Sequence, residues 1–196
     1  VGMIPASTMK VVTAAAALDA LGPSYRFTTE ILRDGEVDSR GTLQGNLYVR
    51  GHGDPTLVVE KLWKLVYDLQ LEGIERISGD VVFDDSFLAG DPRLPGWDKE
   101  EDIENGPSYF PPMSALSVNF NTAALVIGPG ETVGGAARVR LETPADGYVE
   151  IENHLKTVKE GATRRVTVKR EVTDKTTKFI VEGTVPMASP VRRVYR

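Results

Sequence analysis

Apolar residues follow one pattern at the start of the chain and a different one through the rest of it. Residues 7–22 read STMKVVTAAAALDALG, with Pro5 upstream and Gly22 followed by Pro23 downstream. These flanking residues are typical start and stop signals of a helix. Because apolar side chains occupy more than one narrow stripe of this segment, we expect a helix that is buried on most sides.

Beyond Pro23, apolar and polar residues alternate in short runs separated by turn residues, a pattern typical of half-buried strands. One further helix is expected at 54–73, with Asp54 as N-cap, Pro55 as first helical residue and Gly73 as stop. The short connections favour antiparallel pairing. The sequence therefore predicts an α+β fold that is mainly β. The alternating runs are 26–36, 42–51, 76–85, 115–130, 137–144, 147–154, 164–172 and 178–186.

Two segments differ from this alternation. Residues 88–112 are rich in proline and glycine and contain the acidic run DKEEDIE, so we expect a long loop. Loops of this length are usually functional or flexible.

Residues 161–196 carry nine Lys or Arg against three acids. Spread over alternating strands, these charges favour a solvated face over a binding patch.

The composition excludes several classes of protein. The 196 residues include no cysteine and two histidines and carry a net charge of -5. Disulfide scaffolds, thiolate metal sites and nucleic-acid binding are therefore not expected, and we predict no metal and no cofactor. No apolar run is long enough to span a membrane. Because Val1 opens onto Gly-Met-Ile-Pro rather than onto a signal peptide, the chain is expected to be a piece of a longer protein.

Ser7 and Lys10 form the strongest candidate for chemistry. Residues three apart on a helix share a face, so the amine of Lys10 can reach the hydroxyl of Ser7. A serine becomes a nucleophile when a base removes its proton, and a lysine can be that base when burial or a nearby cation keeps it neutral. The competing interpretation is a serine that only caps the helix.

Five segments in order strengthen the catalytic interpretation: IPASTMKVVTAAAALDALGPSYRFTTEIL, LQGNLYVRGHGDPTL, ISGDVVFDDSF, PGWD and SALSVNFNTAALVIGPG. Together they resemble the low-molecular-mass class C penicillin-binding proteins, the D-Ala-D-Ala carboxypeptidases and endopeptidases of the penicillin-binding protein 4 type. The resemblance implies a serine hydrolase of the periplasm or extracellular cell envelope. It would act on peptidoglycan stem peptides and be acylated by β-lactams. Ser7 would be the nucleophile and Lys10 its base.

That family also uses a Ser-x-Asn and a Lys-Thr-Gly motif. Ser117 and Asn119 fit the first pattern, but we reject them because ALSVNFN reads as a strand. Residues 156–158 and 175–177 begin Lys-Thr and lack the glycine that lets a substrate approach the backbone. We therefore expect residues 1–26 to be part of a penicillin-binding catalytic domain and 27–196 to be an inserted, mainly β region that can hold a nested subdomain. Alone, this chain should be incomplete and nearly or wholly inactive.

The resemblance also implies a subsite for the free amino end of the stem peptide. Asp102, Glu104 and Tyr109 are the nearest matches to the acidic and aromatic residues of that subsite, and a carboxylate suits an ammonium group. A solvated acidic loop is the favoured alternative for this segment. Of the remaining polar residues, Asp84 and Asp85 are assigned to a turn or cap, and His52 and His154 are assigned surface or structural roles.

Two other functions stay open. The β region can be a non-catalytic module that binds peptidoglycan or a protein. The chain can also belong to a serine β-lactamase-type hydrolase, which shares the Ser-x-x-Lys chemistry but has no long β region directly after the helix.

Overall fold

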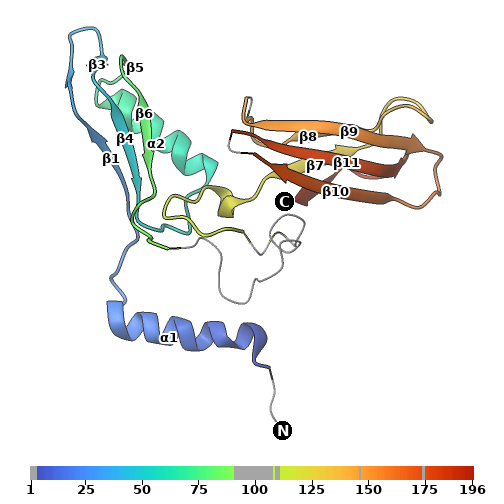
Figure 1. Cartoon of the computed structure of the whole chain (residues 1–196), viewed down its shortest axis with the longest axis horizontal. Helices are drawn as coiled ribbons and strands as arrows, with labels where there is room; N and C mark the ends of the chain where they lie inside the picture. Colours follow the sequence, from blue (N-terminus) through green and yellow to red (C-terminus); the bar gives the residue numbers. More distant parts are fainter. Residues whose placement is uncertain (1–3, 91–107, 109–110, 146, 174) are drawn as a thin grey trace.

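The computed structural model describes residues 4–90, 108, 111–145, 147–173 and 175–196. In chain order, Figure 1 shows a helix, a small sheet with a second helix beside it, and a pair of C-terminal sheets. The fold is α+β and mainly β, as the sequence predicts.

The elements follow one another in three groups. The first is η1 (Ala6–Thr8) and α1 (Met9–Leu21). The second is β1 (Thr29–Arg33), β2 (Glu36–Val37), β3 (Thr42–Gln44), β4 (Leu47–Gly51), α2 (Val59–Leu71), β5 (Arg76–Ile77) and β6 (Val81–Asp84). The third is η2 (Asn119–Asn121), β7 (Ala124–Gly128), β8 (Arg138–Leu141), β9 (Val149–Val158), β10 (Arg165–Val172), β11 (Thr177–Pro186) and β12 (Arg192–Tyr195).

The C-terminal pair of sheets contains the main hydrophobic core. Its sheets have the strand orders β12-β7-β8 and β10-β11-β9. Alternate residues of a strand share a face, so β7 and β11 each direct every second apolar side chain into the core. Full burial of one such side chain stabilises the fold by roughly 1.5–3 kcal/mol. The buried cluster is Leu125, Ile127, Ala137, Leu155, Val168, Phe179, Val181 and Val185.

The outer face of the β10-β11-β9 sheet carries charges of both signs. Lys169 pairs with Glu182 at 3.6 Å, and Lys178 pairs with Glu152. Carboxylates of β9 and β11 thus offset part of the positive charge of the last 36 residues. The lysines of β10 and β11 therefore lie on a solvated face, in agreement with the prediction, and two of them are paired with carboxylates.

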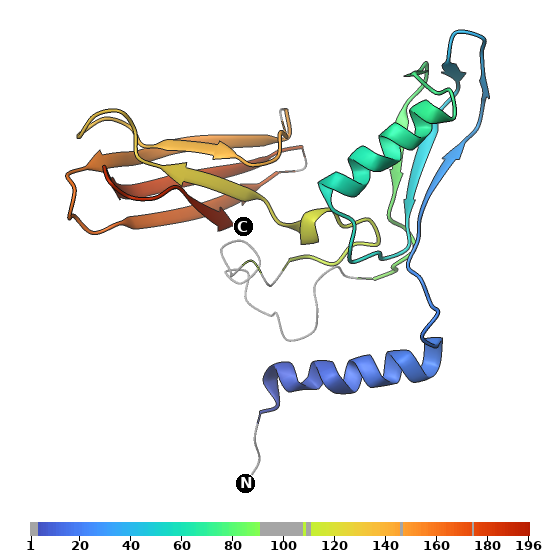
Figure 2. The ribbon, with the colours of Figure 1, turned by 180° about the vertical axis from the view of Figure 1, so that it is seen from behind.

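The second group forms two small sheets with the orders β1-β4-β6 and β2-β3-β5. Leu43, Leu47 and Val49 are buried, and α2 runs alongside the larger sheet in both ribbon views (Figure 1, Figure 2). At the end of β4, a Cβ on Gly51 would lie 2.2 Å from the carbonyl oxygen of Ala115. Only glycine therefore lets the segment after Ala115 pass this close to the sheet.

The strand pairings are mostly antiparallel, with three exceptions among the described residues. β4 with β6, β3 with β5, and β9 with β11 run parallel. A parallel pair needs a crossover between its strands. Helix α2 provides the crossover for the first two pairs, and β10, at the edge of its sheet, lies within the crossover of the third.

Helix α2 begins later than the sequence predicts. It starts at Val59, so the assignment of Asp54 as N-cap and Pro55 as first helical residue is wrong. The carboxylate Oδ1 of Asp54 instead accepts hydrogen bonds from the backbone N–H and the hydroxyl of Thr56, at 2.9 and 2.7 Å. This local turn uses the acceptor that a helix N-cap would need, and Val58 is extended.

The expected strand at 115–130 begins only at Ala124. Asn119, Phe120 and Asn121 have φ angles of 50°, 59° and 51°, in the left-handed region. Asparagine tolerates that region better than most residues because its short amide can form local hydrogen bonds. The alternation of ALSVNFN therefore led to a wrong strand assignment. The sequence also gave no signal for the short strand β12.

Helix α1 exists within the predicted bounds but is not buried. Gly22 ends it with a φ of 77° and donates a backbone hydrogen bond to the carbonyl of Leu18. Every residue of α1 is exposed, Val11 at 72%. The expectation of a helix buried on most sides is wrong for the described residues, because no sheet or helix among them packs against α1.

Candidate active site

Ser7 and Lys10 meet at the start of α1. Lys10 Nζ donates a hydrogen bond to Ser7 Oγ across 2.8 Å. The contact arises because η1 and the first turn of α1 are continuous, which brings residues three apart to the same side. This distance suits proton transfer between the two atoms.

The Ser7 side chain does not cap a helix. Neither η1 nor α1 has a side-chain hydrogen bond at its N-cap position. The Ser7 hydroxyl oxygen accepts its hydrogen bond from Lys10. Ala6, directly before it, has a φ of 45°, a left-handed conformation that costs an alanine roughly 1–2 kcal/mol. The commonest structural role for a serine at a helix start is therefore absent here, and the backbone leading to it is strained.

Both side chains of the pair are exposed. No other side chain in the described ranges hydrogen bonds to Ser7 Oγ or Lys10 Nζ. An ammonium group gives up its proton when burial or a second cation disfavours the charged form. The pair thus has the geometry of a nucleophile and its base, without the enclosure that such chemistry needs.

Ser117 and Asn119 have structural partners. Asn119 Oδ1 accepts a hydrogen bond from the backbone N–H of Val59 at 3.1 Å, so it satisfies the first turn of α2 from 60 residues away. The Ser117 hydroxyl donates to the carbonyl of Ser114 at 3.0 Å. The predicted strand, which was our reason for rejecting these two residues as catalytic, does not form. Their observed partners nevertheless give both of them structural roles.

The two Lys-Thr pairs are also structural. Thr157 is fully buried in β9, and its Oγ1 accepts a hydrogen bond from the backbone N–H of Gly130 at 2.8 Å. Thr176 lies in the turn before β11, where its backbone N–H donates to Thr173 Oγ1 at 2.9 Å. Neither pair lies near Ser7 in the chain or shares a contact with it among the described residues.

Asp102, Glu104 and Tyr109 lie outside the described residues. Their proposed part in a subsite for the amino end of a stem peptide therefore stays a prediction. Asp85 is described, and its Oδ2 accepts a hydrogen bond from the Ser114 hydroxyl at 3.3 Å.

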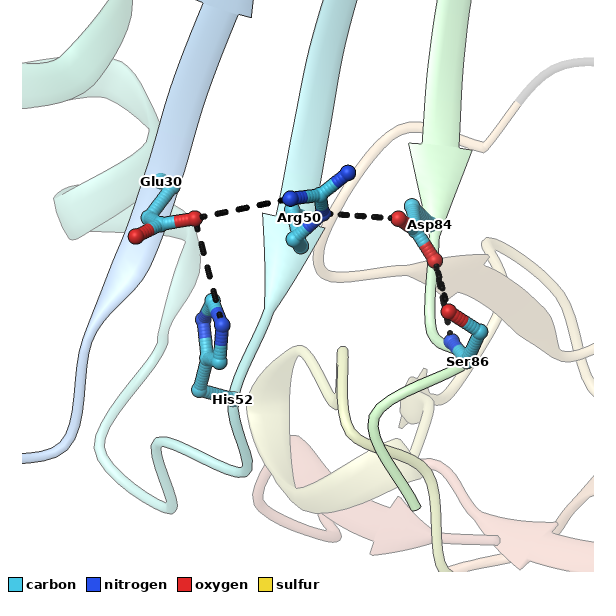
Figure 3. A network of polar contacts seen from close by, with 5 residues as sticks. All are labelled: Glu30, Arg50, His52, Asp84 and Ser86. Atoms are coloured by element: carbon cyan, nitrogen blue, oxygen red, sulfur yellow. Dashed lines mark hydrogen bonds and ion pairs between the residues drawn. The ribbon is translucent and has the colours of Figure 1, made fainter. Parts of the chain in front are cut away.

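Figure 3 shows a polar network at the end of the β1-β4-β6 sheet. Arg50 Nε lies 2.8 Å from Asp84 Oδ2, and Glu30 Oε2 lies 4.0 Å from Arg50 Nη1 and 3.9 Å from His52 Nε2. The Ser86 hydroxyl and backbone N–H, followed by Arg50, hold the pKa of Asp84 at about 2. The network joins all three strands of this sheet.

This network confirms the structural assignments of Asp84 and His52. The ring of His52 packs edge-on against Phe87, with 4.8 Å between ring centroids. His154 lies on the surface in β9, with Nε2 2.6 Å from Glu152 Oε1. Sequence reasoning missed the grouping of Glu30, Arg50 and Asp84. The signal is the register, which places Glu30 opposite Arg50 and Arg50 opposite Asp84.

In the described part of the chain, no group of three or more His, Cys, Asp or Glu side chains could hold a metal ion. No helix there is long and apolar enough to cross a membrane.

The whole chain matches a known family. The model of the D-Ala-D-Ala carboxypeptidase 3 (S13) family matches residues 1–196. The chain belongs to this family. Its sequence is 32% identical over 195 residues to the D-alanyl-D-alanine carboxypeptidase of Actinomadura sp. strain R39. Over 95 residues it is 43% identical to the D-alanyl-D-alanine carboxypeptidase DacB of Haemophilus influenzae. The resemblance found in the sequence is confirmed at the level of the S13 family.

Two solved structures also match this chain over nearly its whole length. The crystal structure of penicillin binding protein 4 from Haemophilus influenzae matches 98% of this chain, with a TM-score of 0.75 and 27% identity. A second structure of that protein, complexed with a β-lactam, matches with a TM-score of 0.64 and 26% identity. The chain spans 35% of the Actinomadura protein and 41% of the first crystal structure. It therefore corresponds to well under half the length of these relatives.

Proposed function

We propose that the protein containing this chain is a serine D-alanyl-D-alanine carboxypeptidase or endopeptidase, with Ser7 as nucleophile and Lys10 as general base. The 2.8 Å hydrogen bond between Lys10 Nζ and Ser7 Oγ is the observation that supports this most strongly. The Ser7 side chain caps no helix, and Lys10 is the only described side chain that hydrogen bonds to the Ser7 hydroxyl.

The chemistry follows from that geometry. Neutral Lys10 takes the hydroxyl proton as Ser7 Oγ bonds to the carbonyl carbon of the penultimate D-Ala. When the tetrahedral intermediate collapses, the C–N bond breaks and the leaving amine receives a proton from the lysine. The resulting ester on Ser7 is then hydrolysed by water, which releases the shortened peptide and restores the free hydroxyl.

Enclosure of the pair must come from elsewhere in the protein. We propose that residues 1–26 belong to the catalytic domain, that 27–196 are an insertion into it, and that the C-terminal pair of sheets is a subdomain of that insertion. The exposed apolar face of α1 is the docking surface for the rest of the catalytic domain. The isolated chain then lacks most of the stabilisation of the developing oxyanion and should be nearly or wholly inactive.

The substrates proposed for the whole protein are peptidoglycan stem peptides, and β-lactams should acylate it at Ser7. A β-lactam complex of the Haemophilus influenzae relative supports the second point. An envelope location, periplasmic or extracellular, follows from that substrate. Asp102, Glu104 and Tyr109 remain our candidates for residues that contact the amino end of the stem peptide.

Covalent labelling tests this function. The test uses a protein that contains this chain and is as long as its relatives. This protein and four variants of it are each incubated with a fluorescent penicillin. The variants are Ser7→Ala, Lys10→Ala and two matched controls, Ser24→Ala and Lys159→Ala. Wild type and controls should label stoichiometrically. Ser7→Ala should not label, and Lys10→Ala should label slower by roughly 10²–10⁴-fold, the usual contribution of a general base.

Other results would redirect the assignment. Labelling that persists in Ser7→Ala would remove Ser7 as the nucleophile. Binding of peptidoglycan without any covalent label would favour the non-catalytic module. A label that forms at Ser7 and is released as fast as it forms would favour a β-lactamase-type hydrolase.

A further inference from the structure

Positive charge gathers at one end of the C-terminal sheets, where β7 ends. Strand pairing brings the segments 127–138, 156–166 and 184–192 together there. These segments contain six Lys or Arg against two Glu, although the whole chain carries a net charge of -5. The six cations are Arg138, Lys156, Lys159, Arg164, Arg165 and Arg192.

These cations differ from the other cations of the same sheets in their partners. Lys169 is paired with Glu182, and Arg193 is paired with Glu142. Among the described residues, no carboxylate forms an ion pair with any of the six cations at the end of β7. The positive charge at this end is therefore not compensated by an ion pair.

Three of the arginines are held in place by the backbone around the end of β7. Arg164 donates hydrogen bonds to the carbonyls of Ile127 and Pro190, each at 3.4 Å. Arg192 in β12 is the register partner of Ile127, and Arg138 donates to the carbonyl two residues after Ile127 at 2.8 Å. Burial and the nearby charge of Arg192 lower the pKa of Arg164. We call Arg138, Arg164 and Arg192 the arginine cluster.

The arginine cluster has the chemistry of a phosphate-binding site. A guanidinium group has five N–H donors, and bonds to one or two carbonyls leave most of them free. Like charges held close together disfavour each other, so an anion between them relieves an unfavourable interaction. The planar fork of a guanidinium group also matches the spacing of phosphate oxygens.

Two exposed apolar side chains lie at the same end. Val191 is exposed at 57% and lies against Gly128, where an added Cβ would come within 2.9 Å of the Val191 side chain. Val133, in the connection between β7 and β8, is exposed at 51%. A soluble anion makes no use of such side chains. A lipid surface does, because apolar groups enter the headgroup boundary while cations stay at the phosphates.

The arginine cluster lies away from the junction between these sheets and the rest of the chain. Ala123 and Arg196, which flank β7 and β12, exchange two backbone hydrogen bonds at the other end of β7. The five residues of β7, roughly 16 Å of strand, separate that junction from the cluster. In both ribbon views the far end of the sheets points away from α1 and α2 (Figure 1, Figure 2). Whatever is joined to the sheets at Ala123 or Arg196 therefore attaches at the opposite end.

We propose that the arginine cluster binds the phosphate headgroups of an anionic lipid membrane, with Val133 and Val191 at the headgroup boundary. This contact would hold the C-terminal sheets at a membrane surface. The inference goes beyond the proposed function and does not depend on it, because lipid binding needs neither Ser7 nor Lys10.

Vesicle sedimentation tests the proposal. This chain and two double variants are mixed with phosphatidylcholine vesicles that either contain or lack phosphatidylglycerol. Arg138→Gln/Arg192→Gln removes two exposed cations of the cluster. Lys169→Gln/Lys178→Gln is the matched control, because it removes the same charge from lysines that have carboxylate partners.

We expect wild type and control to bind the phosphatidylglycerol vesicles with similar affinity and not to bind phosphatidylcholine alone. The cluster variant should lose at least about tenfold in affinity, since each cation at an anionic surface contributes about fivefold. Its fold should persist, because both replaced side chains are exposed. Added salt should weaken the binding of wild type.

Four results would overturn the proposal. These are no binding by wild type, binding that the cluster variant retains, equal losses in the two double variants, and binding to soluble polyphosphate that is as tight as binding to the vesicles. The third result would mean that only net charge matters, and the fourth would favour a soluble polyanion. Penicillin labelling of the whole protein at Ser7 should be unchanged in the cluster variant, so failure of either proposal leaves the other standing.

Discussion

Helix α1 and strand β7 are both dominated by apolar residues, and their environments are opposite. Leu125 and Ile127 in β7 are fully buried. Val11 and Val12 in α1 are exposed at 72% and 59%. Apolar composition alone therefore does not determine burial, because each apolar face also needs a surface that covers it. For β7 the covering sheet is within the described residues, whereas no described sheet covers α1.

The comparison also shows that the main hydrophobic core and the candidate catalytic pair lie in different parts of the chain. The C-terminal sheets hold the large core, and no described residue there resembles a catalytic group. Ser7 lies in η1 and Lys10 in α1, and neither helix contributes a residue to that core. We infer that the β region stabilises the chain by itself, while α1 is built to become buried against another part of the protein.

Removing a buried aromatic side chain from the core of the C-terminal sheets should have the largest effect on stability. Phe179 is 2% exposed in β11. Phe179→Ala should lower the free energy of unfolding by about 3–5 kcal/mol, because it removes buried area and leaves a cavity. Urea denaturation followed by circular dichroism measures this. A loss below 1 kcal/mol would show that the cluster is not the main core.

Removing the side chain that caps α2 from a distant part of the chain should have an intermediate effect on stability. Asn119→Ala removes the acceptor for the Val59 N–H and puts an alanine at a φ of 50°. The expected loss of unfolding free energy is about 1–2 kcal/mol, typical of a lost cap with added backbone strain. Asn119→Asp is the matched control, since it keeps the acceptor and should retain most of the stability. Equal losses in both variants would contradict the capping role.

The Asp84 carboxylate should make the stability of the fold depend on pH. Its pKa is lowered from 3.8 to about 2 in the folded chain, mainly by Ser86. A group with a depressed folded pKa contributes stability that is complete above the unfolded value and lost as the pH falls through the folded value. Wild type should therefore lose its advantage over Asp84→Asn between about pH 4 and pH 2. A difference between the two proteins that does not change with pH across this window would contradict the network.

The smallest effect is expected on α1. Val11→Ala should change the free energy of unfolding by less than about 0.5 kcal/mol, because the side chain is exposed and alanine is the better helix former. In a whole protein the same substitution should be more costly if the rest of the catalytic domain covers α1. A cost above 1 kcal/mol in this chain would mean that α1 already has a packing partner here.

Local features of the fold could be predicted from the sequence. The Ser7–Lys10 contact depends only on helical spacing, and the Gly22 stop depends only on the conformational freedom of one residue. Strands such as β1, β4 and β10 follow from alternation. These features need information from a few neighbouring residues, so a pattern is sufficient to find them.

Features that depend on distant pairing could not be predicted. The Glu30–Arg50–Asp84 network needs the strand register, and the parallel pairing of β9 with β11 needs the position of β10. Asp54 illustrates a local competition, since its carboxylate caps a turn at Thr56 rather than the helix itself. The exposure of α1 is a property of what surrounds it, which no pattern within α1 contains.

The central claim is that Ser7 attacks an acyl donor with the help of Lys10. Peptide mapping after reaction of the whole protein with a β-lactam tests it most directly. We predict that the drug mass is found on the tryptic peptide that ends at Lys10, at Ser7, and that Ser7→Ala abolishes it. A stoichiometric adduct on any other peptide, such as the one containing Ser117, would contradict the account.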